Sequence, residues 1–306
     1  MQGTQLACPG SPRRNPALCS VKRPKELWFM IQKILLADSG TGNSEEMLKQ
    51  LLEIPTLKQA SISILHVVPG QISPEQLTQK WEEGGKLLAT AVQSLKLDPT
   101  KVSTILRQGD PKTVVCQVAE EINTDLIIMG SRGLKRLQSI LQNSVSQYVF
   151  QLSAKPMLLV RDDIYVKRLN RIMVAIDKSE AAQEALKQAI ALARDISGGQ
   201  LLLSHVTSGP AASNPEEDPI LQAAAKTARQ QGIEVKLFTA SSNKAGEAIC
   251  AIAADANADL LILGSPDRRP TIAKGLPDLD RLLGGSISDY VRVYADCPVL
   301  LTRTAA

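Results

Sequence analysis

Short apolar runs alternate with longer amphipathic segments along the chain. The run Leu126-Ile-Ile-Met129 is apolar at every position, which is typical of a strand covered on both faces. The segment 114–122 instead places apolar residues at the 3.6-residue period of a helix with one buried face. In the first half of the chain this alternation predicts strands at 33–37, 61–67, 101–107, 126–129 and 157–160, and helices at 44–52, 74–95, 111–121 and 144–152.

The same pattern occurs a second time. Ile34-Leu-Leu-Ala-Asp38 recurs as Met173-Val-Ala-Ile-Asp177, and Asp125-Leu-Ile-Ile-Met-Gly130 recurs as Asp259-Leu-Leu-Ile-Leu-Gly264. Three further matches keep the same order, and helices are expected at 181–193, 220–231 and 245–254. The chain is therefore expected to hold two copies of one domain, at 30–162 and 170–306, after a leader at 1–29.

Strands that alternate with helices, joined by right-handed crossovers, form a doubly wound parallel sheet with helices on both faces. We therefore expect an α/β fold with two tandem doubly wound domains. Ligands of such sheets bind beyond the carboxyl ends of the strands, where the winding reverses. The segments after the first and fourth strands of each copy are thus the expected place for a site.

Composition limits the classes of partner. Aromatic residues make up only 3% of the 306 residues, which disfavours a stacking surface for single-stranded nucleic acid. The net charge of +4 comes entirely from residues 1–29, so the rest of the chain lacks the basic surface that nucleic acid requires. No apolar run approaches the roughly 20 residues that cross a bilayer. We expect neither a nucleic-acid nor a membrane partner.

Residues 1–29 are rich in Pro, Ser and Arg and show no periodicity, which predicts disorder. They fit either an organelle transit peptide or an upstream start codon, with Met30 directly before the first strand; we favour the second interpretation. The five cysteines form no C-x-x-C pair, and with only two histidines they indicate no zinc site. A reducing, cytoplasmic location fits this cysteine usage.

A glycine-containing loop follows the fourth strand of the first copy. Gly130 and Gly133 allow a close backbone approach to a ligand and a left-handed conformation, and Asn143-Ser144-Val145 opens the next helix. A helix start presents free N–H groups that suit a phosphate. Ser144 is also a good N-cap, so the same residues fit a structural turn. The loop matches neither the P-loop nor the dinucleotide fingerprint.

The ordered combination of motifs resembles the universal stress protein family. It comprises Asp after the first strand, His-Val at the end of the second, the G-x-x-G loop, a helix start nine residues later, and a P-V-L-V-V-like last strand, over nearly all of 30–303. The resemblance implies a five-stranded parallel sheet of order 3-2-1-4-5, with ATP across the ends of strands 1 and 4. Family members pair through their last strands, which implies antiparallel pairing of 157–160 with 299–302 as an internal pseudo-dimer. A larger homodimer stays open.

Carried over by position, the resemblance implies that Asp38 contacts the adenine and that the Val67 backbone lines its pocket. The residues implied on the ribose and phosphate side are Gly130, Gly133, Ser144 and Val145. The chain departs from the family at Asn143, where the motif has glycine. Asn tolerates the left-handed conformation better than other non-glycine residues, but its side chain crowds a phosphate.

The second copy departs further from the family pattern. The residues that correspond are Asp177, Val206, Gly264, Gly285, Ser286 and Ile287. Gly264 and Gly285 are 21 residues apart, against 13 between Gly130 and Asn143, so eight residues are inserted. Gly275 restores the nine-residue spacing to Gly285. The inserted segment either covers the pocket as a lid or blocks it.

His66 and His205 lie at equivalent strand ends without an evident orienting carboxylate, so both are expected to be structural. The resemblance implies a stress-response protein that binds an adenine nucleotide and works through ligand-dependent conformation or assembly. The nucleotide is ATP, or else ADP or AMP, with Mg²⁺ as an optional companion of the phosphates. Two alternatives stay open: a slow ATPase or adenine nucleotide hydrolase, and a nucleotide-free interaction module with decayed pockets.

Overall fold

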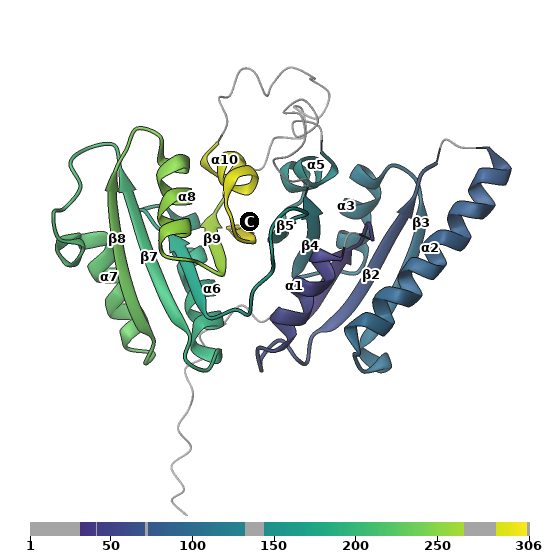
Figure 1. Ribbon diagram of the computed structural model, residues 1–306, viewed down its shortest axis with the longest axis horizontal. Helices are drawn as coiled ribbons and strands as arrows, with labels where there is room; N and C mark the ends of the chain where they lie inside the picture. The colour runs from purple at the N-terminus through teal and green to yellow at the C-terminus, as the bar shows by residue number, and fades with distance from the viewer. Residues whose placement is uncertain (1–30, 41, 71–72, 132–143, 266–285, 305–306) are drawn as a thin grey trace, which may run out of the picture.

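Ten strands form one continuous sheet (Figure 1). The computed structural model describes residues 31–40, 42–70, 73–131, 144–265 and 286–304, and all structural statements refer to these. The strand order is β3-β2-β1-β4-β5-β10-β9-β6-β7-β8. The strands are β1 (Lys33–Ala37), β2 (Ser61–Val68), β3 (Val102–Gln108), β4 (Leu126–Ser131), β5 (Met157–Arg161), β6 (Arg171–Ala175), β7 (Gln200–Thr207), β8 (Glu234–Ser241), β9 (Leu260–Gly264) and β10 (Val299–Thr302).

Each half of the sheet has the order 3-2-1-4-5, with all its strands parallel. In the first half Ile34 of β1 lies opposite Ile62 of β2 on one side and Leu126 of β4 on the other. The fold class predicted from the sequence is confirmed. The halves meet at β5 and β10, which pair antiparallel with Leu158 opposite Leu300, also as predicted.

Helices cover both faces of the sheet. They are α1 (Asn43–Leu52), α2 (Pro74–Leu95), α3 (Pro111–Glu121), α5 (Val145–Leu152), α6 (Glu180–Asp195), α7 (Pro219–Arg229), α8 (Ala245–Asp255) and α10 (Ile287–Tyr294). Buried residues of α1, α2, α6 and α7 pack on one face, and those of α3, α5, α8 and α10 pack on the other. Ile34 and Leu36 enter the first layer and Leu35 enters the second, because successive strand residues point to opposite faces. Both hydrophobic layers continue across the junction of the halves.

Capping residues explain why several helices begin and end where the sequence predicts. The Oγ of Ser73 accepts a hydrogen bond from the Gln76 N–H, and Oε1 of Gln76 accepts one from the Ser73 N–H. These two bonds form a capping box before α2. The helix ends at Lys96, whose φ of 49° is left-handed. Two short 3₁₀ helices, Pro99–Lys101 and Pro215–Glu217, were not expected from the sequence.

Two aspartates hold the first strand of each half beside the fourth. Asp125 Oδ2 accepts hydrogen bonds from the backbone N–H groups of Gln32 and Lys33, each at 2.9 Å. Asp259 Oδ2 accepts the equivalent bond from the Arg171 N–H at 2.8 Å. These carboxylates replace the sheet bonds that the strand starts lack, which gives both repeated aspartates a structural role.

The sequence-predicted leader at 1–29 lies outside the described residues. Among the helices that the structure does describe, no segment combines the length and the apolar character needed to traverse a bilayer.

Adjacent glycines in α2 offer a matched test of packing. A Cβ at Gly84 would stand 2.9 Å from Leu106 Cδ1 and 3.0 Å from His66 Cδ2, whereas a Cβ at Gly85 would meet nothing within 4 Å. We expect Gly85→Ala to raise the free energy of unfolding by about 0.5–1 kcal/mol through helix propensity. Gly84→Ala is expected to lower it by about 1 kcal/mol, because overpacking outweighs the same gain. Urea unfolding followed by circular dichroism measures both; equal stabilisation by the two changes would contradict the packing of α2 on β2.

Candidate functional site

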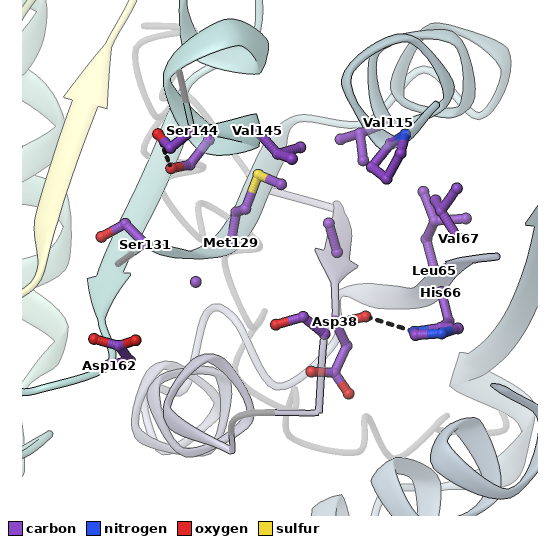
Figure 2. Close-up of a pocket in the computed structure, with 15 residues that line it drawn as sticks. Asp38, Leu65, His66, Val67, Val115, Met129, Ser131, Ser144, Val145 and Asp162 are labelled. Carbon is purple, nitrogen blue, oxygen red and sulfur yellow. Dashed lines mark hydrogen bonds between the residues drawn. The ribbon is translucent and has the colours of Figure 1, made fainter. Parts of the chain in front are cut away.

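A pocket opens at the carboxyl ends of β1 and β4, the place where the winding of the first half reverses (Figure 2). Its volume is about 400 Å³. The sequence-predicted residues that line it are Asp38, Val67, Gly130, Ser144 and Val145. The structure therefore brings together residues from β2, β4, α5 and the segment after β1, although they are far apart in the sequence.

Apolar side chains form one wall of this pocket. Val67 comes from β2, Val115 from α3, Met129 from β4 and Val145 from α5 (Figure 2). Such walls favour a ligand with an apolar or aromatic part, because its burial releases ordered water. Val115 and Met129 were assigned to the core by their periodicity and not to the site; the topology adds the second role.

Two buried polar atoms at the pocket have no hydrogen-bond partner among the described residues. They are Oδ2 of Asp38, a residue only 4% exposed, and Oγ of Ser131 at the end of β4. Buried polar atoms in proteins are ordinarily paired with protein groups, water or a ligand. Both residues line the pocket, so a movement of either side chain would present an acceptor or a hydroxyl to a polar ligand. Ser131 was not singled out from the sequence, although it stands between Gly130 and Gly133.

The backbone around Asp38 is held in place by its neighbours. The Nδ1–H of His66 donates to the carbonyl oxygen of Asp38 at 2.9 Å (Figure 2). Oδ1 of Asp38 accepts the N–H of Gly40 at 2.9 Å, which leaves Oδ2 for other contacts. His66 packs beside Gly84 of α2. The contact with Asp38 supports the structural role expected for His66, which holds the backbone of Asp38 in place.

The charge on Asp38 is costly where it stands. Burial raises the pKa of Asp38 above its ordinary value, and the nearby carboxylate of Glu45 raises it further. The hydrogen bond from Gly40 opposes these effects without cancelling them. Glu45 itself accepts a hydrogen bond from the hydroxyl of Ser94 on α2. A donor that reached Asp38 would relieve this cost.

The start of α5 forms the opposite end of the pocket. Ser144 is the N-cap, and its Oγ accepts the N–H of Gln147 at 3.2 Å. The capping role proposed for Ser144 is confirmed. The N–H groups of Val145 and Ser146 belong to the first turn, where a helix offers no internal acceptor. Since Ser144, Val145 and Ser146 all line the pocket, the positive end of the helix faces it.

The predicted glycines that the structure describes are extended strand residues, and the others lie outside the described residues. Gly130 is the fifth residue of β4 and lies opposite Val160 of β5, so the left-handed loop conformation expected for it is wrong. Gly264 likewise ends β9 as an extended residue. The remaining predicted residues, Gly133, Asn143, Gly275 and Gly285, lie outside the described residues.

The equivalent pocket of the second half is much smaller, at about 100 Å³. Helix α1 begins five residues after Asp38, whereas α6 begins three residues after Asp177. The earlier start brings the backbone of α6 against β9: a Cβ at Gly264 would stand 2.2 Å from the Ala181 carbonyl carbon. Gly264 is thus required by helix packing. The residues brought to this smaller pocket include Asp177, Val206, Gly264 and Ile287.

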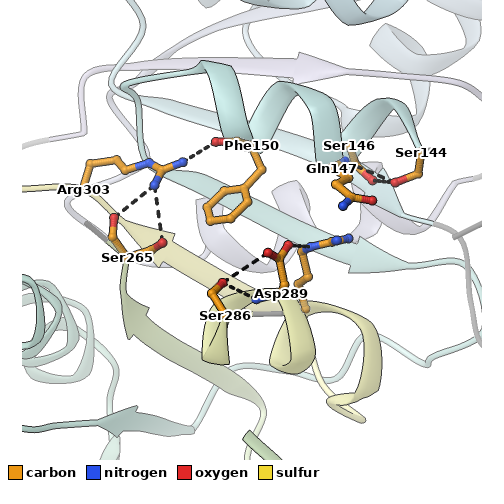
Figure 3. Close-up of polar contacts among 9 residues, drawn as sticks. Ser144, Ser146, Gln147, Phe150, Ser265, Ser286, Asp289 and Arg303 are labelled. Atoms are coloured by element: carbon orange, nitrogen blue, oxygen red, sulfur yellow. Dashed lines mark hydrogen bonds and ion pairs between the residues drawn. The ribbon is translucent and has the colours of Figure 1, made fainter. Parts of the chain in front are cut away.

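Charge also differs between the two copies. Asp177 is exposed, and its Oδ1 accepts the N–H of Ser179, the N-cap of α6, at 2.8 Å. At the start of α10, the N-cap Ser286 donates its hydroxyl to Oδ2 of Asp289 at 3.2 Å (Figure 3). The first copy has the neutral Gln147 at the position of Asp289. The start of α10 therefore carries a carboxylate that the start of α5 lacks, and this carboxylate forms an ion pair with Arg292 at 2.9 Å.

The expectation that neither histidine has an orienting carboxylate is wrong for His205. Its Nδ1–H donates to Oδ2 of Asp218 at 2.7 Å. Burial opposes the ionisation of Asp218, but hydrogen bonds from His205 and from the N–H groups of Leu221 and Ile220 outweigh burial and lower its pKa. Asp218 is the N-cap of α7, so the pair ties β7 to that helix. Asp218 was missed because it lies outside the repeated motifs.

Where the structure describes them, the acidic, cysteine and histidine side chains do not gather into a metal centre. No group of three such residues that could hold an ion occurs within the described ranges.

The lowered pKa of Asp218 predicts a pH-dependent contribution to stability. A carboxyl whose pKa is depressed in the folded state stabilises it above the unfolded pKa, and the contribution disappears as the pH falls through the folded value. We expect Asp218→Asn to cost about 1–2 kcal/mol at pH 7, because Asn still caps a helix but loses the charge-assisted bond to His205. The difference from the wild type is expected to vanish once the pH falls below the lowered pKa of Asp218.

Urea titrations across this range, with the exposed Glu82→Gln as control, provide the measurement. A difference that stays constant down to acidic pH would show that the charge of Asp218 contributes nothing.

Comparison with known proteins identifies the family. The model of the universal stress protein family matches residues 30–161 and again residues 168–303. Universal stress protein YxiE of Bacillus subtilis is 31% identical over 148 residues, which are 43% of this chain and 100% of YxiE. Universal stress protein MJ0577 of Methanocaldococcus jannaschii is 27% identical over 43% of this chain and 96% of its own length.

A solved structure resembles the whole arrangement. The crystal structure of a universal stress protein from Archaeoglobus fulgidus has a TM-score of 0.71 and 26% sequence identity, covering 91% of this chain and 98% of the other. The similarity thus extends over both halves, including their junction. With the family model matched twice, the chain belongs to the universal stress protein family and is a tandem two-domain member of it.

Proposed function

We propose that the pocket of the first domain binds one adenine nucleotide, preferably ATP, and that the second domain is a nucleotide-free half. The observation that carries this proposal is the polarity of the 400 Å³ pocket. It has an unpaired buried carboxylate oxygen on Asp38 at one end, the positive start of α5 at the other, and apolar side chains between them.

Each part of the pocket suits one part of a nucleotide. The exocyclic amino group of adenine is a hydrogen-bond donor, and Asp38 Oδ2 is an acceptor without a donor among the residues that the structure describes. The flat base fits between apolar walls such as Val67, Val115 and Met129. The phosphates fit the N–H groups at the start of α5, where a helix attracts anions. ADP and AMP offer the same base with fewer charges, so their affinity reports how much the α5 end contributes.

The second pocket supports the assignment of the other half. At about 100 Å³ it is below the roughly 300 Å³ at which small-molecule sites begin. Its aspartate, Asp177, is exposed and hydrogen-bonded locally, and its helix start already has the carboxylate of Asp289. In this proposal the second domain contributes by pairing β10 with β5. Through this pairing it transmits the ligand-dependent changes of conformation by which we propose that the protein acts in stress response.

Replacement of the two equivalent aspartates tests the proposal. We expect Asp38→Asn to weaken ATP binding at least tenfold, since a hydrogen bond to a charged acceptor contributes about 1.5–3 kcal/mol. Asp177→Asn is the matched control and is expected to leave the affinity unchanged. Isothermal titration, with and without Mg²⁺, measures affinity and stoichiometry, with one ATP per chain expected. Two equal sites, or no binding by the wild type, would contradict the proposal.

Asp38→Asn, which is expected to weaken ATP binding, is expected to increase the stability of the ligand-free protein. Because the pKa of Asp38 is higher in the folded than in the unfolded chain, its ionisation costs stability at every pH above that raised value. We expect ligand-free Asp38→Asn to unfold at a higher urea concentration than the wild type at pH 7, a gain of about 1 kcal/mol typical of a relieved functional site. A less stable variant would show that Asp38 has a structural partner.

A further inference from the structure

We propose that Arg303, at the end of the second domain, is a positioning residue for the phosphate end of the nucleotide site in the first domain. This inference rests on the proposed function and adds to it a dependence on the other half of the chain. Arg303 directly follows β10 and is 8% exposed, so its guanidinium group is placed by the fold and not by solvent.

The guanidinium group of Arg303 connects the two domains (Figure 3). Its Nη1 donates to the carbonyl oxygen of Ser265 at 3.0 Å, in the segment that follows β9 of its own domain. Its Nη2 donates to the carbonyl oxygen of Phe150, on α5 of the other domain. Its central carbon lies 4.3 Å from the centroid of the Phe150 ring, a distance at which a cation and an aromatic face attract.

The contact with Phe150 falls at the end of α5. Phe150 is in the last turn of this eight-residue helix, where the carbonyl groups receive no hydrogen bond from an N–H of the same helix. Arg303 supplies both the missing donor and a positive charge at the negative end of the helix, an arrangement that stabilises it. The carbonyl of the preceding Val149 is already used by the N–H of Ser153 at 2.8 Å. Arg303 thus adds a restraint that the domain itself does not provide.

Because α5 is short, the position of its carboxyl end determines the position of its amino end. From Phe150 to Val145 the helix rises only about 7–8 Å, and a helix of two turns moves as a rigid body. The N–H groups of Val145 and Ser146, which line the pocket, therefore shift when Phe150 shifts. Hydrogen bonds to phosphate depend on distance and angle, so their strength falls when these groups move. The base end of the pocket at Asp38, which follows β1, does not depend on this restraint.

The symmetry of the chain provides a control. Arg161 ends β5 as the counterpart of Arg303 and reaches in the opposite direction, to the end of α10. Its Nη1 donates to the carbonyl oxygens of Ala295 at 2.8 Å and Val293 at 3.1 Å. Arg161 thus restrains the helix whose start carries Asp289. Under the proposal it makes no contribution to the phosphate end of the first site.

The experiment compares ATP with adenosine, which has the base and ribose but no phosphates. Arg303→Met retains much of the side-chain length and loses every donor, while Arg303→Lys keeps a charge and one donor to Phe150. We expect Arg303→Met to weaken ATP binding roughly tenfold and to leave adenosine binding within about twofold, as the loss of one charge-assisted bond between a phosphate and the displaced N–H groups of α5 predicts. Arg303→Lys should recover part of the ATP affinity, and Arg161→Met should leave it unchanged. Equal losses for both ligands, or an equal loss in Arg161→Met, would overturn the proposal.

A second measurement needs no nucleotide. Amide hydrogen exchange of full-length protein reports local opening of each helix. We expect the amides of α5 to exchange at least severalfold faster in Arg303→Met and those of α10 to do so in Arg161→Met. If the wild type binds neither ATP nor adenosine, the proposed function fails, and unchanged exchange of α5 in Arg303→Met would separately show that Arg303 does not hold this helix.

Discussion

The antiparallel pairing of β5 with β10 is the interaction on which the rest of the architecture depends. It joins two five-stranded sheets into one, so the apolar layers on the two faces continue from one domain into the other. It also directs an arginine at the end of each of these strands toward the other domain. Arg161 and Arg303 reach the ends of α10 and α5 for this reason. Each domain therefore contributes to the placement of a helix that it does not contain.

A difference of two residues in the start of one helix separates the two pockets. In the first copy the segment from Asp38 to α1 includes Gly40 and Gly42, both left-handed, and the helix begins late. In the second copy Ser179 caps α6 earlier, and the helix backbone reaches Gly264. The volume falls about fourfold between the copies, from 400 to 100 Å³. Equivalent positions thus enclose different spaces, because the covering helix begins earlier in the second copy.

The sequence predicted the fold better than the site. The alternation of apolar runs and helical periods predicted the helix at 74–95 with the limits that the structure shows, and the family resemblance implied the sheet order. Features that depend on approach between distant segments could not be predicted. The bond from His205 to Asp218 can be predicted only if the path of the segment before α7 is known. The need for glycine at position 264 follows only from the position of α6. Neither has a local pattern in the sequence.

The outer strands β3 and β8 have a consequence for self-association. Every other strand in the described part of the sheet has two neighbours, so unsatisfied backbone groups in extended conformation are confined to these two margins. Exposed charges occur on both, including Arg107 on β3 and Lys236 on β8. Charges at such positions discourage another chain from adding a strand. Any association of copies through strand addition would have to bury such charges, which favours contacts through helices instead.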